Sequence, residues 1–547
     1  MTAVAGISSE GRRRCSLVGR LAVIRGLWWA VGLASIFAVA AVLMRPLIPI
    51  DETRYLTVAW EMRLSHDWLV PHLNGQTYSH KPPMMFWLIN LAWSIFGENV
   101  FVARLVPAAF LPVTVWLAGV LGQKVGGRAV GDQAALIAVS FVVFAVTSTL
   151  VMFDAMLTAA CLTALIGLVL AVQGRWGRGF LLFGLMIGLG VLIKGPAALM
   201  HVMPAALLAP LWAESRRSWL GWYAGVVAAL ALGAAIALAW ALPAAHAGGP
   251  EFGQMILWGQ TTGRMVKAFD HARPFWYFAA LAPVLLLPWT VSRNLWAALL
   301  DRRPSSSPAS RISRLPWIAA AGTFVLFSLV SGKQIHYVSP ALPSLAIGIA
   351  ILLGRRPQSV TEDGFAVVAF ILGAVMVLSY PLDLLGESGP PYAFAIGGAV
   401  TMLGSALVWT LRRTPAVAGA MAAASIFAGL HVGAVMGGLS IHDPSWVTPW
   451  LRTPDGERSV AVAGDYAGEY GYAARLTRPV DRIEPWQGPE WLAEHPGGVL
   501  VHSYRHGDDP ASDRPATELR PYRTGMLAVW TEGPPLVVDT SDAPATR

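Results

Sequence analysis

The sequence is poor in charged residues and has almost no cysteine. Of its 547 residues, 13% are Asp, Glu, Lys or Arg, and it has two cysteines, Cys15 and Cys161. One lies in the N-terminal tail and the other in a hydrophobic run, which excludes a disulfide framework and a thiolate metal site. The low charge, together with 55% hydrophobic residues and a mean hydropathy of +0.54, excludes an ordinary soluble globular protein.

Two further classes are disfavoured by what is missing. The sequence has no nucleotide-binding loop of the type GxxxxGK[ST], so we expect no nucleotide cofactor. Its net charge of +8 comes mostly from Lys and Arg placed between hydrophobic runs. Positive charge distributed in this way marks membrane sidedness, so we expect no nucleic-acid partner.

Long hydrophobic runs are what the sequence does contain. Runs of roughly 20 residues can each cross a hydrocarbon layer of ~30 Å. The sequence therefore predicts an all-α polytopic membrane protein with about 13 transmembrane helices. The expected spans are 24–45, 100–122, 130–150, 153–172, 179–194, 196–213, 218–243, 276–298, 315–331, 338–354, 364–381, 391–411 and 415–437.

The distribution of Lys and Arg predicts the orientation of these spans. Arg12, Arg13 and Arg14 place the N-terminus in the cytoplasm, and every later loop assigned to that side carries Lys or Arg. This alternation requires that residues 82–97 do not cross the membrane. We expect a juxtamembrane helix there, opened by Pro82 and Pro83.

The chain divides into three parts by composition. Residues 1–23 form a cytoplasmic tail and residues 24–437 a transmembrane domain, which includes external loops at 46–99 and 244–275. Residues 438–547 are richer in charge and proline and predict a small external α/β domain. We expect strands at 458–464, 498–504 and 526–533, with helical turns at 468–477 and 489–495.

Ionisable residues gather in the external loops. A charge near hydrocarbon costs about 2.5–3.5 kcal/mol, so several charges at span ends favour a shared polar cavity. Simpler readings remain open: Asp51 and Asp154 could be interfacial or capping residues, and His336 a plain loop histidine. The pair Gly184 and Gly188 indicates close helix packing.

Two kinds of chemistry suit external acids next to several cations. In a transfer from a lipid-phosphate donor, the cations neutralise the phosphate leaving group and a carboxylate serves the acceptor or stabilises an oxocarbenium ion. A transporter or flippase for a lipid-linked sugar would instead place its charges at mid-membrane on broken helices. Here the charges lie at the external edge.

Several ordered motifs resemble one family. The first external loop, residues 51–88, is similar to that of the aminoarabinose (4-amino-4-deoxy-L-arabinose) transferases that modify lipid A. More broadly it resembles the bacterial relatives of protein O-mannosyltransferases, which are C-type membrane glycosyltransferases. The likeness continues, in order, through FGENVFVARL, VMFDAML, GLGVLIKGPAAL, GRMVKAFDHARPFWYF, LPWT and FSLVSGKQIHY.

The resemblance implies an inverting glycosyltransferase in the bacterial inner membrane that takes a sugar from a polyprenyl (undecaprenyl) phosphate on the periplasmic side. Asp51 and Asp154 match the family's two acids, and Lys81 matches the lysine of its KP motif. The positions expected to bind the donor phosphate or line the cavity are Arg54, Tyr55, Lys194, Arg264, Lys333 and Tyr337.

One departure from the aminoarabinose transferases affects a possible metal. They tend to have Glu before the KP lysine, where this chain has His80. A divalent ion would then be held by imidazoles, and His80 and His271 are the candidate ligands. The acceptor also stays open. A lipid A phosphate needs no proton removed, whereas a hydroxyl on protein or glycan would need Asp51 as general base.

Overall fold

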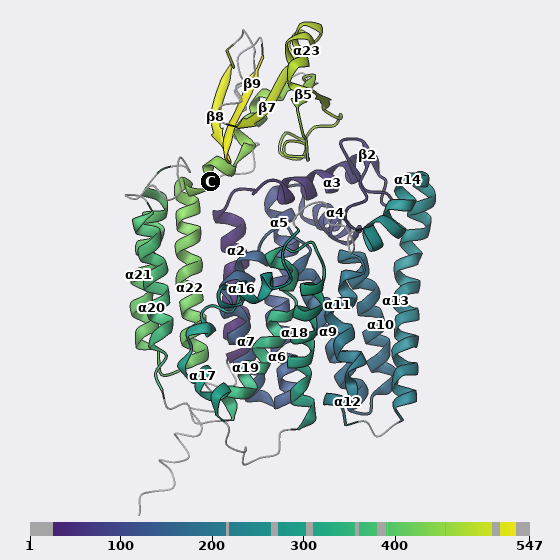
Figure 1. Cartoon of the computed structure of the whole chain (residues 1–547). Helices are drawn as coiled ribbons and strands as arrows, with labels where there is room; N and C mark the ends of the chain where they lie inside the picture. Colours follow the sequence, from purple (N-terminus) through teal and green to yellow (C-terminus); the bar gives the residue numbers. More distant parts are fainter. Residues whose placement is uncertain are drawn as a thin grey trace, which may run out of the picture.

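The computed structural model describes a helical bundle that carries a small sheet domain at one end (Figure 1). The end of the bundle next to the sheet is called the domain end below. The ranges described are 26–214, 218–263, 272–301, 310–355, 360–379, 390, 392–453, 456–505 and 515–531. The candidate site residues Arg264 and His271 lie outside them, as does the N-terminal tail.

Helices long and apolar enough to cross a membrane account for most of the bundle. The structure has 8 such candidate spans within its described residues: Gly26–Met44 (α2), Val100–Gly126 (α5 and α6), Asp154–Val172 (α9), Trp176–Lys194 (α10), Trp219–Ala247 (α13), Arg311–Leu329 (η3 and α18), Tyr392–Thr410 (α21) and Pro415–Gly438 (α22 and η5). Shorter apolar helices are Met84–Phe96 (α4), Ala197–Leu207 (α11), Ala341–Gly354 (α19) and Asp363–Leu378 (α20). The protein is therefore a multi-pass helical membrane protein.

Three predicted spans are interrupted, and the one expected at 196–213 is divided at Leu208. The span expected at 130–150 is divided at Phe141 into Arg128–Ser140 (α7) and Val142–Thr147 (α8), because Phe141 has extended backbone angles. The span expected at 276–298 is divided into Tyr277–Leu285 (α16), Trp289–Val291 (η2) and Arg293–Leu300 (α17). Pro288 lies at this last break, and proline cannot donate the backbone hydrogen bond that a continuous helix needs.

The loop expected at 244–275 is largely helical up to residue 263. Helix α13 continues to Ala247, and Gly249–Gln254 (α14) and the π-helix Met255–Gly263 (η1) follow it. The remaining short helices are Ala209–Trp212 (α12), Ile335–Val338 (η4), Ser440–His442 (η6) and Pro444–Trp450 (η7).

The segment expected to form the first external loop, residues 46–99, is compact and lies at the domain end (Figure 1). It contains helix Asp51–Ser65 (α3), the hairpin His72–Leu73 (β1) with Gln76–Thr77 (β2), and α4. Helix α4 has 13 residues, fewer than the roughly 17 that a span requires.

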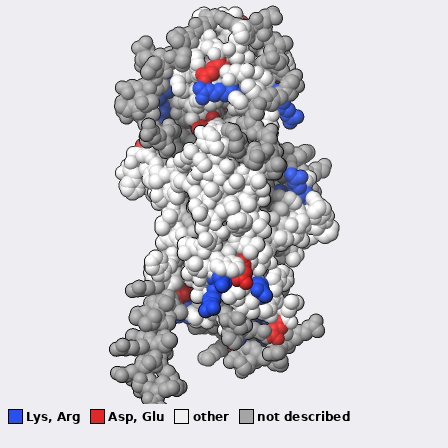
Figure 2. Space-filling view, turned by 90° about the vertical axis from the view of Figure 1, so that its left-hand side faces the viewer, with Lys and Arg blue, Asp and Glu red and all other residues white. Residues whose placement is uncertain are grey.

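Charge is partitioned along the molecule. On the face seen in Figure 2, acidic and basic side chains gather toward the two ends, and a wide uncharged band separates them. At the end opposite the sheet, Asp363 pairs with Arg293 at 3.5 Å and Arg412 at 3.2 Å. An uncharged belt between charged ends is what a hydrocarbon layer requires.

The C-terminal domain is built on a five-stranded mixed sheet. Its order is β6-β5-β7-β9-β8, with β5 parallel to β6 and β7, and β9 antiparallel to β7 and β8. The strands are Val460–Ala463 (β5), Asp481–Ile483 (β6), Val499–Arg505 (β7), Glu518–Tyr522 (β8) and Gly525–Trp530 (β9), with a separate pair Arg452–Thr453 (β3) and Gly456–Glu457 (β4). Successive residues of β5 enter opposite hydrophobic clusters, and Pro485–Gln487 (η8) and Gly488–Glu494 (α23) lie between β6 and β7.

Glycine allows α10 and α13 to pack closely. A Cβ at Gly184 would lie 2.7 Å from the carbonyl oxygen of Ala229, and one at Gly188 would lie 2.7 Å from Ile236. The expectation that this pair serves helix packing is therefore correct, since backbone-to-backbone contact leaves no room for a side chain.

We predict that Gly184→Ala lowers the free energy of unfolding by about 1–3 kcal/mol, because the new methyl group must push α13 away. Gly177→Ala in the first turn of the same helix is the matched control, since a Cβ there meets nothing within 4 Å. Thermal unfolding in detergent measures both variants. Equal melting temperatures would show that the α10–α13 contact tolerates the extra volume.

Candidate active site

Helix α3 presents three of the predicted site residues on one face. Asp51, Arg54 and Tyr55 are spaced i, i+3 and i+4, which aligns their side chains. The Oδ1 atom of Asp51 accepts a hydrogen bond from Arg54 Nη2 and a second from Tyr55 Oη at 3.1 Å. Burial and the charge of Asp51 raise the pKa of Tyr55 well above its usual value, so the phenol stays protonated and donates.

A second group forms where α9 begins and α10 ends. Lys194, the last residue of α10, donates a hydrogen bond of 2.5 Å to Asp154 Oδ1, and the Asp154 side chain is only 3% exposed. His336 from η4 places Nε2 3.9 Å from Asp154 Oδ2. Lys194 Nζ also lies 4.9 Å from the ring centre of Tyr337. The antiparallel helices thus place an acid and a cation side by side.

His336 was expected to be a plain loop histidine, and the structure places it beside Asp154. Burial lowers its pKa to about 4; Asp154 opposes that shift, and Lys194 and Lys81 reinforce it. The imidazole is therefore neutral at pH 7. A hint was its position in GKQIHY, one residue before the predicted site residue Tyr337.

Aromatic side chains connect the two groups. The Tyr55 ring meets Phe153 edge-on at 5.0 Å, and Phe153 immediately precedes Asp154. Phe86 of α4 contacts Phe153 at 5.9 Å, and Lys81 Nζ lies 5.9 Å from the Phe153 ring centre. The structure therefore brings Asp51, Arg54, Tyr55, Lys81, Asp154, Lys194 and Tyr337 into one region.

Among the other predicted residues, Lys333 and His80 have contacts of their own, and Arg264 and His271 lie outside the described ranges. Lys333 is 3% exposed, and its ammonium group donates to the backbone carbonyls of Val330 and, at 2.9 Å, Arg273. These bonds tie η4 to the segment that begins at residue 272, so a contact of Lys333 with a donor phosphate stays a prediction. His80 is exposed, with its ring 5.2 Å from Tyr78.

The described residues do not furnish a metal centre by themselves. Among them, no three or more His, Cys, Asp and Glu residues form a group that could hold an ion. Since His271 lies outside the described ranges, its pairing with His80 stays a prediction, and no chemical step is derived through a metal.

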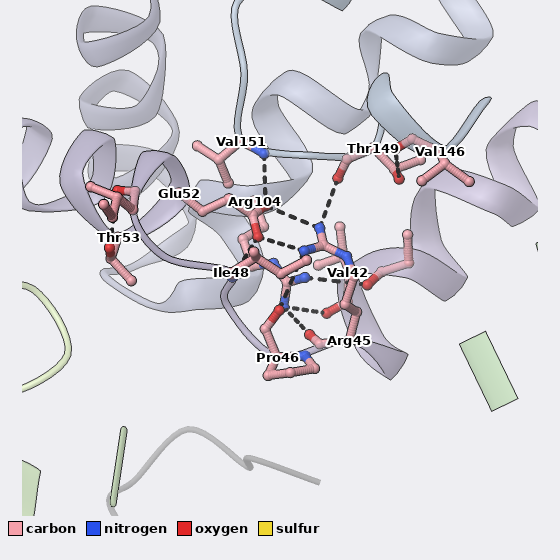
Figure 3. A network of polar contacts seen from close by, with 12 residues as sticks. Val42, Arg45, Pro46, Ile48, Glu52, Thr53, Arg104, Val146, Thr149 and Val151 are labelled. Carbon is pink, nitrogen blue, oxygen red and sulfur yellow. Dashed lines mark hydrogen bonds and ion pairs between the residues drawn. The ribbon is translucent and has the colours of Figure 1, made fainter. Parts of the chain in front are cut away.

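A buried network beside Asp51 was not assigned a role from the sequence (Figure 3). Glu52 is 2% exposed and makes a two-point ion pair with Arg45, with distances of 2.5 and 3.0 Å. Arg104 of α5 donates to the backbone carbonyls at the end of α2, including that of Arg45 at 2.6 Å. Buried charges survive only when paired and hydrogen-bonded, and here each has partners.

Glu52 also links the two chain segments that carry the candidate acids, because its carboxylate accepts hydrogen bonds from backbone N–H groups. Its carboxylate accepts from the N–H of Ile48 at 2.8 Å and from that of Val151 at 2.8 Å (Figure 3). Glu52 follows Asp51 directly, and Val151 precedes Asp154 by three residues. The network therefore fixes the loop that leads to one acid relative to the helix that carries the other.

Glu52 must be ionised for this arrangement. Burial raises its pKa, but the charge and hydrogen bonds of Arg45, aided by Arg104 and the Ile48 amide, lower it to about 2 from an ordinary 4.5. A folded-state pKa below the unfolded one gives stability that is fully present above pH 4.5 and is lost as pH falls through about 2.

We predict that Glu52→Gln lowers the free energy of unfolding by about 3–5 kcal/mol at pH 7, because Arg45 is left buried without its counter-charge. The variant should also lose less stability than the wild type between pH 4.5 and 2, which unfolding in detergent at several pH values measures. Glu98→Gln is the control. The Glu98 side chain, which pairs with Arg63, is 36% exposed, so this substitution should lower the free energy of unfolding by no more than about 1 kcal/mol. Equal losses would contradict the role given to Glu52.

Comparison with known proteins relates the chain to one group of transferases. Residues 80–244 match the family described as dolichyl-phosphate-mannose-protein mannosyltransferase. The chain is 32% identical over 341 residues to the undecaprenyl phosphate-alpha-4-amino-4-deoxy-L-arabinose arabinosyl transferase of Pseudomonas aeruginosa (strain LESB58), covering 60% of this chain and 61% of that one. It is 31% identical over 312 residues to the corresponding transferase 1 of Pseudomonas fluorescens (strain Pf0-1), covering 56% and 53%.

The chain thus spans between about half and three-fifths of the length of these curated relatives. The fold agrees over a longer stretch. The crystal structure of ArnT from Cupriavidus metallidurans bound to undecaprenyl phosphate superimposes with a TM-score of 0.70, covering 92% of this chain and 97% of that one at 20% identity. The chain is therefore similar in sequence, over three-fifths of its length, to undecaprenyl phosphate-alpha-4-amino-4-deoxy-L-arabinose arabinosyl transferases, and it shares its fold, over nearly all of its length, with the ArnT of Cupriavidus metallidurans.

Proposed function

We propose that the protein is an inverting glycosyltransferase that moves a sugar from undecaprenyl phosphate to lipid A. The observation that carries this proposal is the meeting of two acids, Asp51 and Asp154, with two lysines, Lys81 and Lys194, at the domain end of the bundle. The relatives' names supply the donor class and the sugar, 4-amino-4-deoxy-L-arabinose.

The proposed reaction exchanges one bond at the anomeric carbon. The bond from that carbon to the donor phosphate oxygen breaks, a bond to the acceptor oxygen forms on the opposite face, and undecaprenyl phosphate leaves. Lys81 and Lys194, with Arg264, would neutralise the departing phosphate. The isoprenoid tail would lie in the membrane, where burial contributes about 0.8 kcal/mol per CH₂ group.

The surroundings of Asp51 favour a phosphate acceptor. Its Oδ1 already accepts hydrogen bonds from Arg54 and Tyr55, which suits a carboxylate that orients the acceptor or stabilises positive charge on the sugar. A phosphate of lipid A is anionic at pH 7 and attacks without a general base.

A second candidate is a transferase that glycosylates a hydroxyl on protein or glycan. The match of residues 80–244 to the mannosyltransferase family supports it. In that case Asp51 would remove the proton from the acceptor hydroxyl as it attacks. The donor class and the direction of attack would be the same, so identifying the acceptor separates the two candidates.

The proposed function also implies a membrane location and a topology. We place the chain in the bacterial inner membrane with about 13 spans, a cytoplasmic N-terminus, and the active site and C-terminal domain in the periplasm. The Lys and Arg bias of the loops supports this orientation, and the gathering of charge at the two ends of the molecule (Figure 2) supports the placement across a membrane.

We predict that Asp51→Asn lowers transfer by at least about a hundredfold, because the amide cannot stabilise developing positive charge. Asp67→Asn in the same loop is the matched control. Its Oδ1 only accepts from the N–H groups of Leu69 and Val70, which an amide oxygen can also do. Transfer is measured with purified protein by mass spectrometry of lipid A and of total envelope glycans. Near-normal transfer by a well-folded Asp51→Asn would overturn the assignment, and a sugar found only on protein or glycan would establish the second candidate.

The topology predicts opposite labelling of two exposed positions. In a chain without its natural cysteines, Leu519→Cys in β8 should react in intact spheroplasts with a membrane-impermeant maleimide, because that domain is periplasmic. Arg413→Cys, in the turn between α21 and α22 at the other end, should react only after lysis. Leu519 is 47% exposed and Arg413 is exposed. The reverse pattern would invert the whole topology.

A further inference from the structure

The C-terminal domain rests on the helix that carries Asp51. Residues 466–480, called the docking segment here, lie against α3 and the β1–β2 hairpin at the domain end (Figure 1). None of the functional residues proposed above belongs to this segment. Its contacts nevertheless reach the residues that neighbour Asp51 and Arg54.

Thr57 stands at the centre of this contact. It is 1% exposed, its Oγ1 donates to the carbonyl oxygen of Gly468 at 2.8 Å, and it accepts from the N–H of Tyr472 at 3.0 Å. One hydroxyl therefore satisfies two backbone groups that the domain brings into a buried interface. A helix side chain that both donates and accepts across such an interface fixes both the distance and the orientation of the domain relative to the helix.

Two glycines make the approach possible. A Cβ at Gly468 would lie 3.3 Å from Arg54 Cα, and Gly468 has a φ of +86° that other residues rarely adopt. A Cβ at Gly471 would lie 2.5 Å from Thr57 Cγ2. The backbone of the docking segment thus touches that of α3 directly over Arg54.

Further contacts hold the same two surfaces together. Trp60 donates its indole N–H to the carbonyl oxygen of Leu476 at 2.8 Å, and Tyr472 stacks on Trp93 of α4 with ring centres 5.1 Å apart. Asn74 of the hairpin turn makes two hydrogen bonds with the backbone of Val480, at 2.8 and 3.0 Å. The domain therefore contacts all three elements: α3, α4 and the hairpin.

The docking segment also adds a charge near Arg54. Burial raises the pKa of Glu469, while the amides of Ala467 and Glu469 and then the positive charge of Arg54 oppose that shift. Arg54 therefore interacts electrostatically with Glu469 and also forms an ion pair with Asp51.

We propose that Thr57 is a positioning residue for the transfer reaction. It locks the docking segment onto α3 and so keeps Arg54, and through it Asp51, in the orientation that the donor meets. The proposal rests on the proposed function, since it assigns Thr57 a role in that reaction, and it gives the C-terminal domain a task that needs no catalytic residue of its own.

The test compares Thr57→Val with Thr57→Ser. Valine has nearly the same shape and removes both hydrogen bonds, whereas serine keeps them. For Thr57→Val we expect kcat to fall between about tenfold and a hundredfold, with a smaller change in KM, because misplaced groups slow the chemical step. Thr57→Ser should stay near the wild type. The substrates are undecaprenyl phosphate-linked 4-amino-4-deoxy-L-arabinose and purified lipid A in detergent.

A second readout follows the contact itself. Hydrogen exchange of the backbone amides at 51–57 and 468–476 should become faster in Thr57→Val and stay slow in Thr57→Ser. Gly471→Ala leaves α3 chemically unchanged and should reproduce both effects, since its methyl group displaces the domain.

Thr517→Val is the matched control for a lost hydroxyl. Thr517 likewise donates to and accepts from one backbone partner, Thr531, at 3.2 and 3.0 Å, but it precedes the edge strand β8 and is exposed. This variant should keep normal kcat and normal exchange at 51–57.

Each outcome separates the positioning role from the proposed function. If the wild type transfers the sugar and Thr57→Val does so at the same rate, the positioning role is wrong and the proposed function stands. The positioning role is equally wrong if Thr57→Ser or Thr517→Val is as slow as Thr57→Val, or if exchange at 51–57 is unchanged. If the folded wild type transfers no sugar to any envelope acceptor, the proposed function fails and the role of Thr57 in transfer fails with it.

Discussion

The ionised carboxylate of Glu52 is the constraint on which the arrangement at the domain end depends. A buried charge is tolerated only with full compensation, and Glu52 obtains it from Arg45 and from the amides of Ile48 and Val151. These partners come from the end of α2 and from the loop before α9. The same interaction that neutralises one charge therefore sets the distance between the segments that carry Asp51 and Asp154.

The cations of the candidate site are held by acids in a similar way. Lys194 pairs with Asp154, and Arg54 pairs with Asp51. A phosphate entering the site would compete with these carboxylates for the same cations. Binding would then exchange one ion pair for another, so the free energy gained by binding the phosphate is smaller than two new ion pairs would give. Release of the phosphate leaving group is easier for the same reason.

The sheet domain and the bundle are stabilised by different means and meet at α3. The domain buries alternate residues of its central strands in two clusters, while the bundle depends on close helix contacts such as that of Gly184 with Ala229. At their junction, hydrogen bonds from the side chains of Thr57, Trp60 and Asn74 to the backbone of the domain hold the two parts together. A polar junction of this kind specifies one orientation more sharply than apolar packing does.

The sequence by itself determined the features that depend on near neighbours along the chain. Hydrophobic run length and Lys or Arg bias predicted a multi-pass membrane protein, and the spacing of Asp51, Arg54 and Tyr55 is local to one helix. Short apolar runs predicted β5, β7 and β9, whereas β6 and β8 were missed because edge strands are largely exposed and carry no such run. Only the tertiary structure decided that His336 joins Asp154 and Lys194, that Glu52 bridges two loops, and that Thr57 meets Gly468. Val151 is 99 residues from Glu52 and Gly468 is 411 residues from Thr57, and no local periodicity records which distant groups compensate a buried charge or hydroxyl.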